Sequence, residues 1–175
     1  MVDDARLTAQ DWLAQEDERD RTARISRLRW LAERVPSSDP WIFHDGIAAR
    51  VLFEEARYCF VYGQYIAVVL LGVAFIERSL AARIYGAGDD ALERAHLPRL
   101  LPIAQERGWL SADECALIDA LRHKRNPLAH FRGPGDPTRF EWRAVLRNVA
   151  PYTVFEEDAR AVLEAVLRYV ERSTP

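Results

Sequence analysis

The chain has little cysteine and no long apolar run, and both shortages limit what it can be. Its two cysteines, Cys59 and Cys115, lie in apolar stretches without metal-ligand spacing, so we expect reduced, buried thiols in a cytoplasmic protein. The longest apolar run, Tyr65 to Ile76, is too short to span a bilayer. It predicts a core helix, and no membrane partner is expected. The N-terminal residues also lack the basic-then-apolar order of an export signal.

A large excess of charge of either sign is missing as well. The formal net charge of −3 over 175 residues argues against a protein that coats nucleic acid by bulk electrostatics. Positive charge is nevertheless concentrated between residues 120 and 135, where four cations and two histidines occur without an acid: Arg122, Lys124, Arg125 and Arg132, with His123 and His130. This stretch suits a defined phosphate site, although such runs are more often solvated faces.

Strand-like alternation is not sustained anywhere, whereas apolar residues recur with helical spacing almost throughout. The sequence therefore predicts an all-α protein built as an antiparallel helical bundle. The Pro-Ser-Ser-Asp-Pro segment at 36–40 indicates a linker between an N-terminal helical extension, residues 1–38, and a bundle domain, residues 39–175. We expect four apolar residues of the extension to be buried: Trp12, Ile25, Leu28 and Leu31.

In the bundle domain, spacing and stop signals predict helices over 44–62, 64–85, 89–95 and 97–107. A later helix should begin at the capping box formed by Ser111 and Glu114, with Leu117, Ile118 and Leu121 facing the core.

A second capping box, Thr153 with Glu156, predicts the start of the last helix. Residues 139–148 are compatible with a short helix or an irregular arm. If that segment is helical, three arginines share a face that is either a solvated stripe or an edge that follows RNA: Arg139, Arg143 and Arg147.

A cation, an amide and an imidazole come together at the end of the helix that Ser111 starts. Arg122, Asn126 and His130 are four residues apart and share a helix face, with Arg125 beside them. Pro127 should bend the helix end because it removes a backbone donor. Cations also stabilise a helix C-terminus, and on spacing alone that is the commoner role.

The chemistry of these side chains fits cleavage of RNA by its own 2′-hydroxyl. That reaction needs an acid or base that works near neutral pH, which His130 can provide. It also needs positive charge beside the phosphorane, which the planar guanidinium of Arg125 can supply. Asn126 could bind phosphate or fix the histidine tautomer. No metal or cofactor is expected, since the four histidines form no ligand cluster in the sequence.

The run Leu121-Arg-His-Lys-Arg-Asn-Pro-Leu-Ala-His130 resembles the signature of the HEPN (higher eukaryotes and prokaryotes nucleotide-binding) superfamily. Its ribonuclease members carry arginine, often asparagine, and then histidine after a short spacer. The resemblance covers roughly Trp41 to Arg172. It implies a helical bundle that forms a homodimer, with two motifs facing each other across one composite cleft. It also implies a metal-independent endoribonuclease that leaves a 2′,3′-cyclic phosphate, often a toxin or an antiviral-defence effector.

The resemblance assigns roles to individual residues. Arg125 and His130 would be catalytic, with Asn126 supporting them, and the RNA would also meet Arg122, Lys124 and Arg132. Glu77 matches an acid that many members carry on an earlier core helix.

For Glu77, a plain salt bridge to an arginine is the other and more frequent explanation. Regulated HEPN toxins usually have tyrosine two residues after the histidine. Arg132 stands there in this chain, so control through a modified tyrosine is not expected.

Two alternatives stay open at the level of sequence. The same basic helix end could belong to a non-catalytic HEPN module that binds nucleotide, RNA or a protein partner. The chain could also be a structural helical dimer without a ligand. An antitoxin or another regulatory protein is a further candidate partner.

Overall fold

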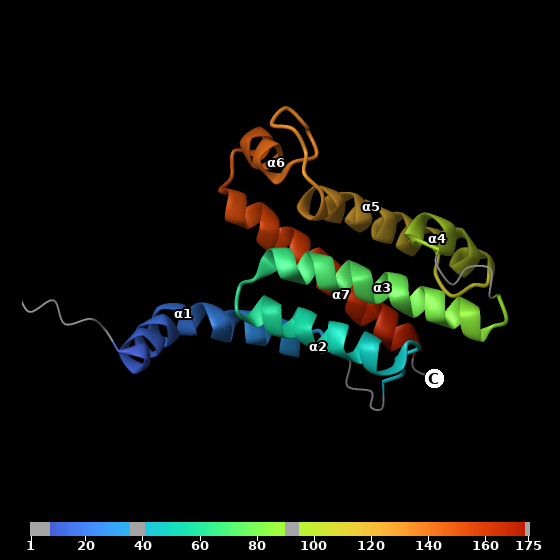
Figure 1. Ribbon diagram of the computed structural model, residues 1–175, viewed down its shortest axis with the longest axis horizontal. Coiled ribbons are helices and arrows are strands. Elements are labelled where there is room, and N and C mark those ends of the chain that lie inside the picture. Colours follow the sequence, from blue (N-terminus) through green and yellow to red (C-terminus); the bar gives the residue numbers. More distant parts are fainter. Residues whose placement is uncertain (1–7, 36–40, 90–94, 174–175) are drawn as a thin grey trace, which may run out of the picture.

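The computed structural model describes residues 8–35, 41–89 and 95–173. These residues form seven helices and no strand, which confirms the all-α prediction. The helices are α1 (Ala9–Ala32), α2 (Gly46–Val61), α3 (Tyr65–Gly86), α4 (Leu97–Glu106), α5 (Ala112–Ala129), α6 (Phe140–Arg147) and α7 (Pro151–Ser173), as Figure 1 shows. The predicted linker at 36–40 and most of the helix predicted at 89–95 lie outside the described residues.

Helix α3 lies at the centre of the bundle and contacts α2, α4, α5 and α7 (Figure 1). By length and composition it could cross a membrane, but half of its most apolar stretch is buried against other helices of the described structure. Its apolar stripe is the one predicted for residues 64–85. This helix therefore forms the core, an arrangement that is compatible with a soluble protein.

Gly72 explains how closely α3 and α7 approach each other. A Cβ atom at this position would lie 2.3 Å from Cγ1 of Val162 and 3.4 Å from Cγ2 of Val166. The first distance is far inside van der Waals contact, so a larger residue would force the two helices apart. The glycine thus allows α7 to pack tightly against the centre of the bundle.

The predicted start of α5 is confirmed. The Ser111 hydroxyl accepts a hydrogen bond from the Glu114 amide at 3.3 Å, and the Glu114 carboxylate accepts one from the Ser111 amide at 2.7 Å. Ile118 and Leu121 are buried, and Leu117 packs partly buried against the core. One face of α5 is therefore fixed on the bundle, which positions the residues at its far end.

The second predicted capping box is wrong, because α7 begins at Pro151 and places Thr153 inside the helix. Proline already has the φ angle that a first helical turn needs, so it starts the helix early. Just before it, Asn148 ends α6 in the left-handed conformation, at φ 51°. The expected apolar face of α7 is confirmed by five buried residues: Phe155, Ala159, Val162, Val166 and Val170.

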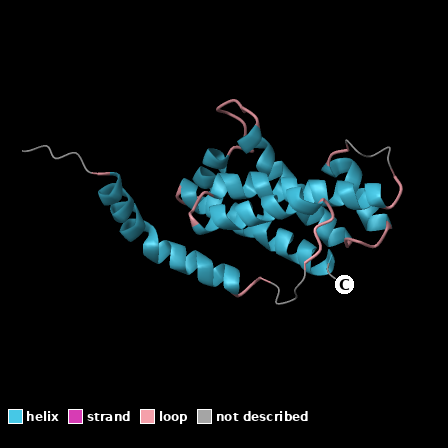
Figure 2. Cartoon of the chain, turned by 60° about the horizontal axis from the view of Figure 1, so that its bottom comes forward, coloured by secondary structure: helices cyan, strands magenta, loops and turns pink. Residues whose placement is uncertain are grey.

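Helix α1 is a single long helix whose first half projects from the bundle (Figures 1 and 2). Leu31 is buried as expected, but Trp12, Ile25 and Leu28 are 64%, 40% and 50% exposed, so those three predictions are wrong. Only the C-terminal part of α1 packs on the core, where Trp30 meets Phe60 with ring centroids 4.9 Å apart.

An arginine rather than an apolar residue fills the next buried position of α1. The Nε of Arg27 donates to the carbonyl oxygen of Val61 at 2.7 Å, and its guanidinium also pairs with Asp20. Such a position is hard to recognise in a sequence, because the partner carbonyl comes from a distant helix. The two cysteines are free thiols, with Cys115 buried and Cys59 only partly buried.

Candidate active site at the end of α5

The predicted motif occupies the last turn of α5 and the residue after it. The backbone amide of His130 donates to the carbonyl oxygen of Asn126 at 3.0 Å, so the helix continues through Pro127 up to this point. His130 itself is extended, at φ −133° and ψ 137°. Its side chain is exposed, whereas Arg125 and Asn126 are half-buried. Within the described residues, no hydrogen bond joins the three side chains to one another.

Arg125 stands out among the arginines for its surroundings. Three arginines of the described structure have a buried Nε without a hydrogen-bond partner, namely Arg24, Arg57 and Arg125. Arg24 still forms an ion pair with Asp17, and the guanidinium of Arg57 lies over aromatic rings. Arg125 has neither kind of partner among residues 8–35, 41–89 and 95–173. It is a half-buried cation whose hydrogen-bonding capacity is unused.

The neighbouring cations of the motif are paired inside the protein. Arg122 donates from Nε to Asp119 at 2.8 Å, and its Nη2 lies 2.8 Å from a ring nitrogen of His123. The ammonium of Lys124 lies 2.9 Å from the carboxylate of Asp158. The run 120–135 lacks acids in the sequence, but the fold supplies them from just before it and from α7. Its expected excess of positive charge is therefore smaller in the structure.

Asp158 is the residue that sequence analysis missed. Its carboxylate is buried and binds both Lys124 and Arg143, the latter at 2.8 Å through Nη2. It thus ties α5 and α6 to α7. A signal was present, since Asp158 lies on the apolar face of α7 between Phe155 and Ala159. An acid on such a face requires cationic partners.

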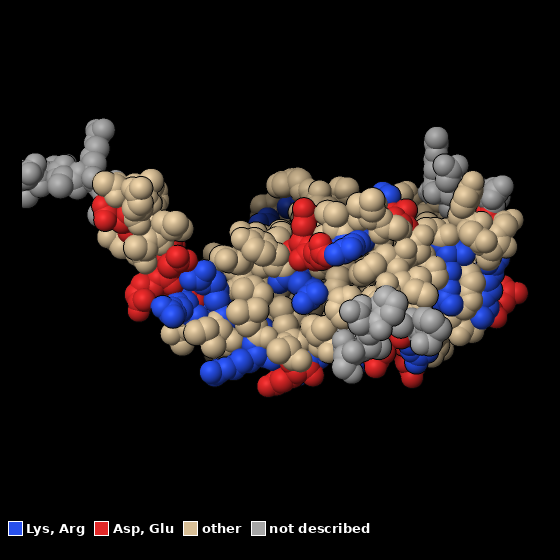
Figure 3. Space-filling view, turned by 90° about the horizontal axis from the view of Figure 1, so that it is seen from below, with Lys and Arg blue, Asp and Glu red and all other residues tan. Residues whose placement is uncertain are grey.

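Arg139, Arg143 and Arg147 lie on the segment for which a short helix and an irregular arm are both compatible with the sequence. The segment is helical, but each arginine has its own acid: Arg139 pairs with Glu141, Arg147 with Glu157, and Arg143 with the buried carboxylate just described. These contacts neutralise the row instead of leaving it open to RNA. Figure 3 shows the opposite side of the molecule, where α1 and α2 lie, and there too acids and bases are intermixed.

Arg132 remains exposed in the loop that follows His130. Its carbonyl oxygen accepts a hydrogen bond from Nη1 of Arg139 at 3.5 Å. The nearest acid of the loop is Asp136, whose pKa is lowered mainly by hydrogen bonds from Thr138 and further by the charges of Arg132 and Arg139. Arg132 is therefore exposed to solvent beside the motif, and its contact with RNA stays a prediction.

Glu77 is placed away from the motif. Its carboxylate lies 3.1 Å from Nδ1 of His96, the residue that precedes α4, and not beside an arginine. Figure 1 shows α5 running antiparallel to α3, so the end of α5 lies near the first turns of α3, while Glu77 is in its second half. Among the described residues, Glu77 pairs with His96 and with no arginine, and no hydrogen bond or ion pair joins it to the motif.

The described part of the chain contains no group of three or more histidine, cysteine, aspartate or glutamate side chains that could hold a metal ion. Comparison of the chain with protein-family models, curated proteins and solved structures found no match. A functional proposal must therefore rest on the contacts of the motif and on its resemblance to a known signature.

Proposed function

We propose that this protein is a metal-independent endoribonuclease of HEPN type whose site is the end of α5. One observation carries the proposal: among the described residues, Arg125 and His130 have no ion-pair partner, while the flanking Arg122 and Lys124 do. A cation that is half-buried and unpaired costs stability unless a ligand binds it. The phosphate of RNA is a ligand that a planar guanidinium binds well.

The reaction assigns a role to each of these groups. His130 accepts the proton of the ribose 2′-hydroxyl as O2′ forms a bond to the adjacent phosphorus. Arg125 binds the non-bridging oxygens, where negative charge increases in the phosphorane. The bond from phosphorus to O5′ then breaks, and the leaving oxygen takes up a proton. The products are a 2′,3′-cyclic phosphate and a 5′-hydroxyl, and Asn126 supports the site by a hydrogen bond to phosphate or to the imidazole.

A homodimer fits this chemistry because two proton transfers are needed at the same phosphate. One imidazole accepts the first proton, and a second protonated imidazole can supply the one for O5′. His130 of a second copy meets that need if the two helix ends face each other across a two-fold axis. His130 is exposed on the single chain, as such an arrangement requires.

The proposed biological role follows the resemblance of the motif to HEPN effectors. In this proposal the protein acts on RNA in the cytoplasm, as a toxin or an antiviral-defence effector, and an antitoxin or another regulatory protein holds it inactive. Arg132, at the position where regulated toxins have tyrosine, supports a form of control other than tyrosine modification.

The test is RNA cleavage in the presence of a chelator by the wild type and two variants, Arg125→Ala and His130→Ala. Each variant should lose cleavage while being at least as thermally stable as the wild type and keeping its solution mass. Arg99→Ala, which removes an exposed arginine on α4, is the matched control and should cut normally. Normal cleavage by both site variants would refute the site. RNA binding without cleavage by the wild type would identify the non-catalytic binding module instead.

A further inference from the structure

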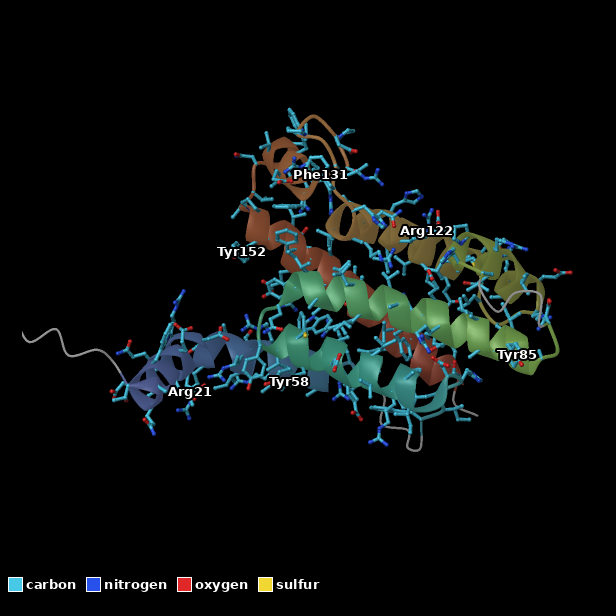
Figure 4. All side chains as sticks on the ribbon, in the orientation of Figure 1. Arg21, Tyr58, Tyr85, Arg122, Phe131 and Tyr152 are labelled. Carbon is cyan, nitrogen blue, oxygen red and sulfur yellow. The ribbon has the colours of Figure 1, made fainter. Side chains whose placement is uncertain are left out.

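The loop between α5 and α6 presents an aromatic side chain directly beside the proposed site. Phe131 follows His130 and is 90% exposed, the highest exposure among the large apolar side chains of the described residues. It has no aromatic or cationic stacking partner there. Figure 4 shows it at the top of the view, well away from Tyr85, which lies at the far end of α3. An exposed phenylalanine is unfavourable in water, so its place beside the proposed RNA site suggests that a ligand covers it.

The loop that carries Phe131 is bound to the rest of the structure, because two side chains donate hydrogen bonds to its carbonyl groups. The indole nitrogen of Trp142 donates to the carbonyl oxygen of Pro134 at 2.8 Å. Arg139 donates to the carbonyl oxygen of Arg132 at 3.5 Å. Together these contacts fix the backbone on the C-terminal side of Phe131, while α5 fixes it on the other side.

The ring also borders a pocket rather than a flat surface. A shallow pocket of about 130 Å³ is lined by Phe131 with five other residues: Pro127, Arg132, Arg139, Phe140 and Glu141. Its apolar members offer surfaces for a flat ring. Its charged members are the ion pair of Arg139 with Glu141 and the exposed Arg132.

We propose that Phe131 and this pocket bind an unpaired base of a single-stranded RNA next to the cleaved phosphate. This inference rests on the proposed function, since it takes RNA as the ligand. Aromatic side chains beside cations are the usual platform for single-stranded nucleic acid, because every base has a π-face that can stack on them. Bases inside a duplex are stacked on each other and cannot reach such a ring. The substrate is therefore single-stranded at the cut.

The charges around the ring suit the two parts of a nucleotide differently: a neutral base suits the pocket, and a negatively charged phosphate suits the arginines beside it. Arg132 follows Phe131 in sequence, and Arg125 lies in the preceding helix turn. Asp136 is the acid of the loop, and its hydrogen bonds from Thr138 hold it there. A neutral base in the pocket and a phosphate towards Arg125 and Arg132 satisfy both kinds of group.

The experiment measures binding of a single-stranded RNA of about ten nucleotides with 2′-O-methyl riboses, which cannot attack their own phosphates. The RNA carries a fluorescein for affinity, and a second version carries 2-aminopurine, whose fluorescence falls when the base stacks. Phe131→Ala should weaken binding about tenfold and abolish the 2-aminopurine quenching. Phe131→Trp should keep both. Tyr85→Ala, at an exposed aromatic far from the site, is the control and should bind as the wild type does.

Three results would overturn the inference. One is unchanged binding and quenching by Phe131→Ala, and another is a wild type that binds the duplex of the same sequence as tightly as the single strand. The third is a changed solution mass of Phe131→Ala, which would assign the ring to the contact between two copies. Failure of the base site and failure of the nuclease are distinguishable. If Phe131→Ala weakens binding but the wild type cuts no RNA, the base site is supported and the nuclease is not. If Phe131→Ala binds and cuts RNA as the wild type does, the nuclease is supported and the base site is not.

Discussion

A buried carboxylate and a half-buried guanidinium lie on neighbouring helices of this protein, and their surroundings are opposite. Asp158 on α7 is buried and meets two cations, Lys124 from α5 and Arg143 from α6. Arg125, one residue after Lys124, has a buried Nε and meets no acid among the described residues. The charge of Asp158 is balanced by residues of the chain itself, and these contacts join three helices. The charge of Arg125 is not balanced by any described residue, so a ligand can bind it.

The largest expected effect concerns Arg125. Arg125→Lys keeps the positive charge but replaces a planar set of donors by a single ammonium. We expect RNA cleavage to fall by about 10²- to 10³-fold, the usual loss when one donor to a developing oxyanion is removed. Single-turnover rates in the presence of a chelator measure this. A rate equal to that of the wild type would show that charge alone is needed and would weaken the comparison.

The next effect concerns Asp158. Asp158→Asn removes the negative charge between Lys124 and Arg143, and we expect the free energy of unfolding to fall by about 2 kcal/mol. The loss is below that of a fully buried pair because both cations are partly exposed and regain water. Chemical denaturation measures it. A variant as stable as the wild type would show that Asp158 does not hold the three helices together.

A control for this stability change is available in the core. Gly72→Ala should cost about 1–2 kcal/mol, because its methyl group would collide with Val162. This variant leaves the cations of α5 untouched. Both variants, Asp158→Asn and Gly72→Ala, should lower the free energy of unfolding without changing the cleavage rate of the folded protein. That result would show that Asp158 stabilises the fold and takes no part in cleavage.

A smaller loss of stability is expected when Lys124, the cation that pairs with Asp158, is replaced. Lys124→Gln loses an ion pair whose lysine is 35% exposed, so stability should fall by about 0.5 kcal/mol. Cleavage should remain within about twofold of the wild type, because Lys124 is already engaged by Asp158. Parallel melting curves and cleavage rates decide the point. A loss as large as that of Arg125→Lys would place Lys124 in the site after all.

The smallest effect is a pH dependence away from the motif. Among the described residues, the ring nitrogen Nε2 of His44 is buried without a hydrogen-bond partner, and burial, together with the charge of Arg83, lowers its pKa below 6.5. The unfolded chain therefore binds this proton more readily than the folded protein. Stability from the neutral ring is present above pH 6.5 and is lost as the pH falls below it. His44→Gln should flatten the stability curve between about pH 7.5 and 5.5, and an unchanged slope would contradict this origin.

The parts of the fold that the sequence predicts well depend on local patterns. The apolar stripe of α3 and the capping box at Ser111 involve residues within one or two helical turns, so they can be recognised without a fold. The motif was located in the same way, because Arg125, Asn126 and His130 belong to one helix end.

Apart from the capping box at Thr153, which fails because Pro151 starts α7 earlier, the predictions that failed depend on partners that are distant in the sequence. The exposure of Trp12 follows from where α1 leaves the bundle, which no local pattern shows. The partners of Lys124 and Glu77 are also distant in the sequence, since Lys124 pairs with Asp158 and Glu77 meets His96. Which cation of a basic run is left unpaired is a property of the fold. That is the property on which the site assignment depends.

The most direct test uses an RNA that the wild type cuts and a second copy with a single 2′-deoxy nucleotide at the cut position, both with a chelator present. We expect the wild type to cut the first into a product ending in a 2′,3′-cyclic phosphate and to leave the second intact at that position. His130→Ala should cut neither. Cleavage at the deoxy position, or equal cleavage of the all-ribose RNA by His130→Ala, would contradict a site in which the unpaired Arg125 and His130 act on the 2′-hydroxyl.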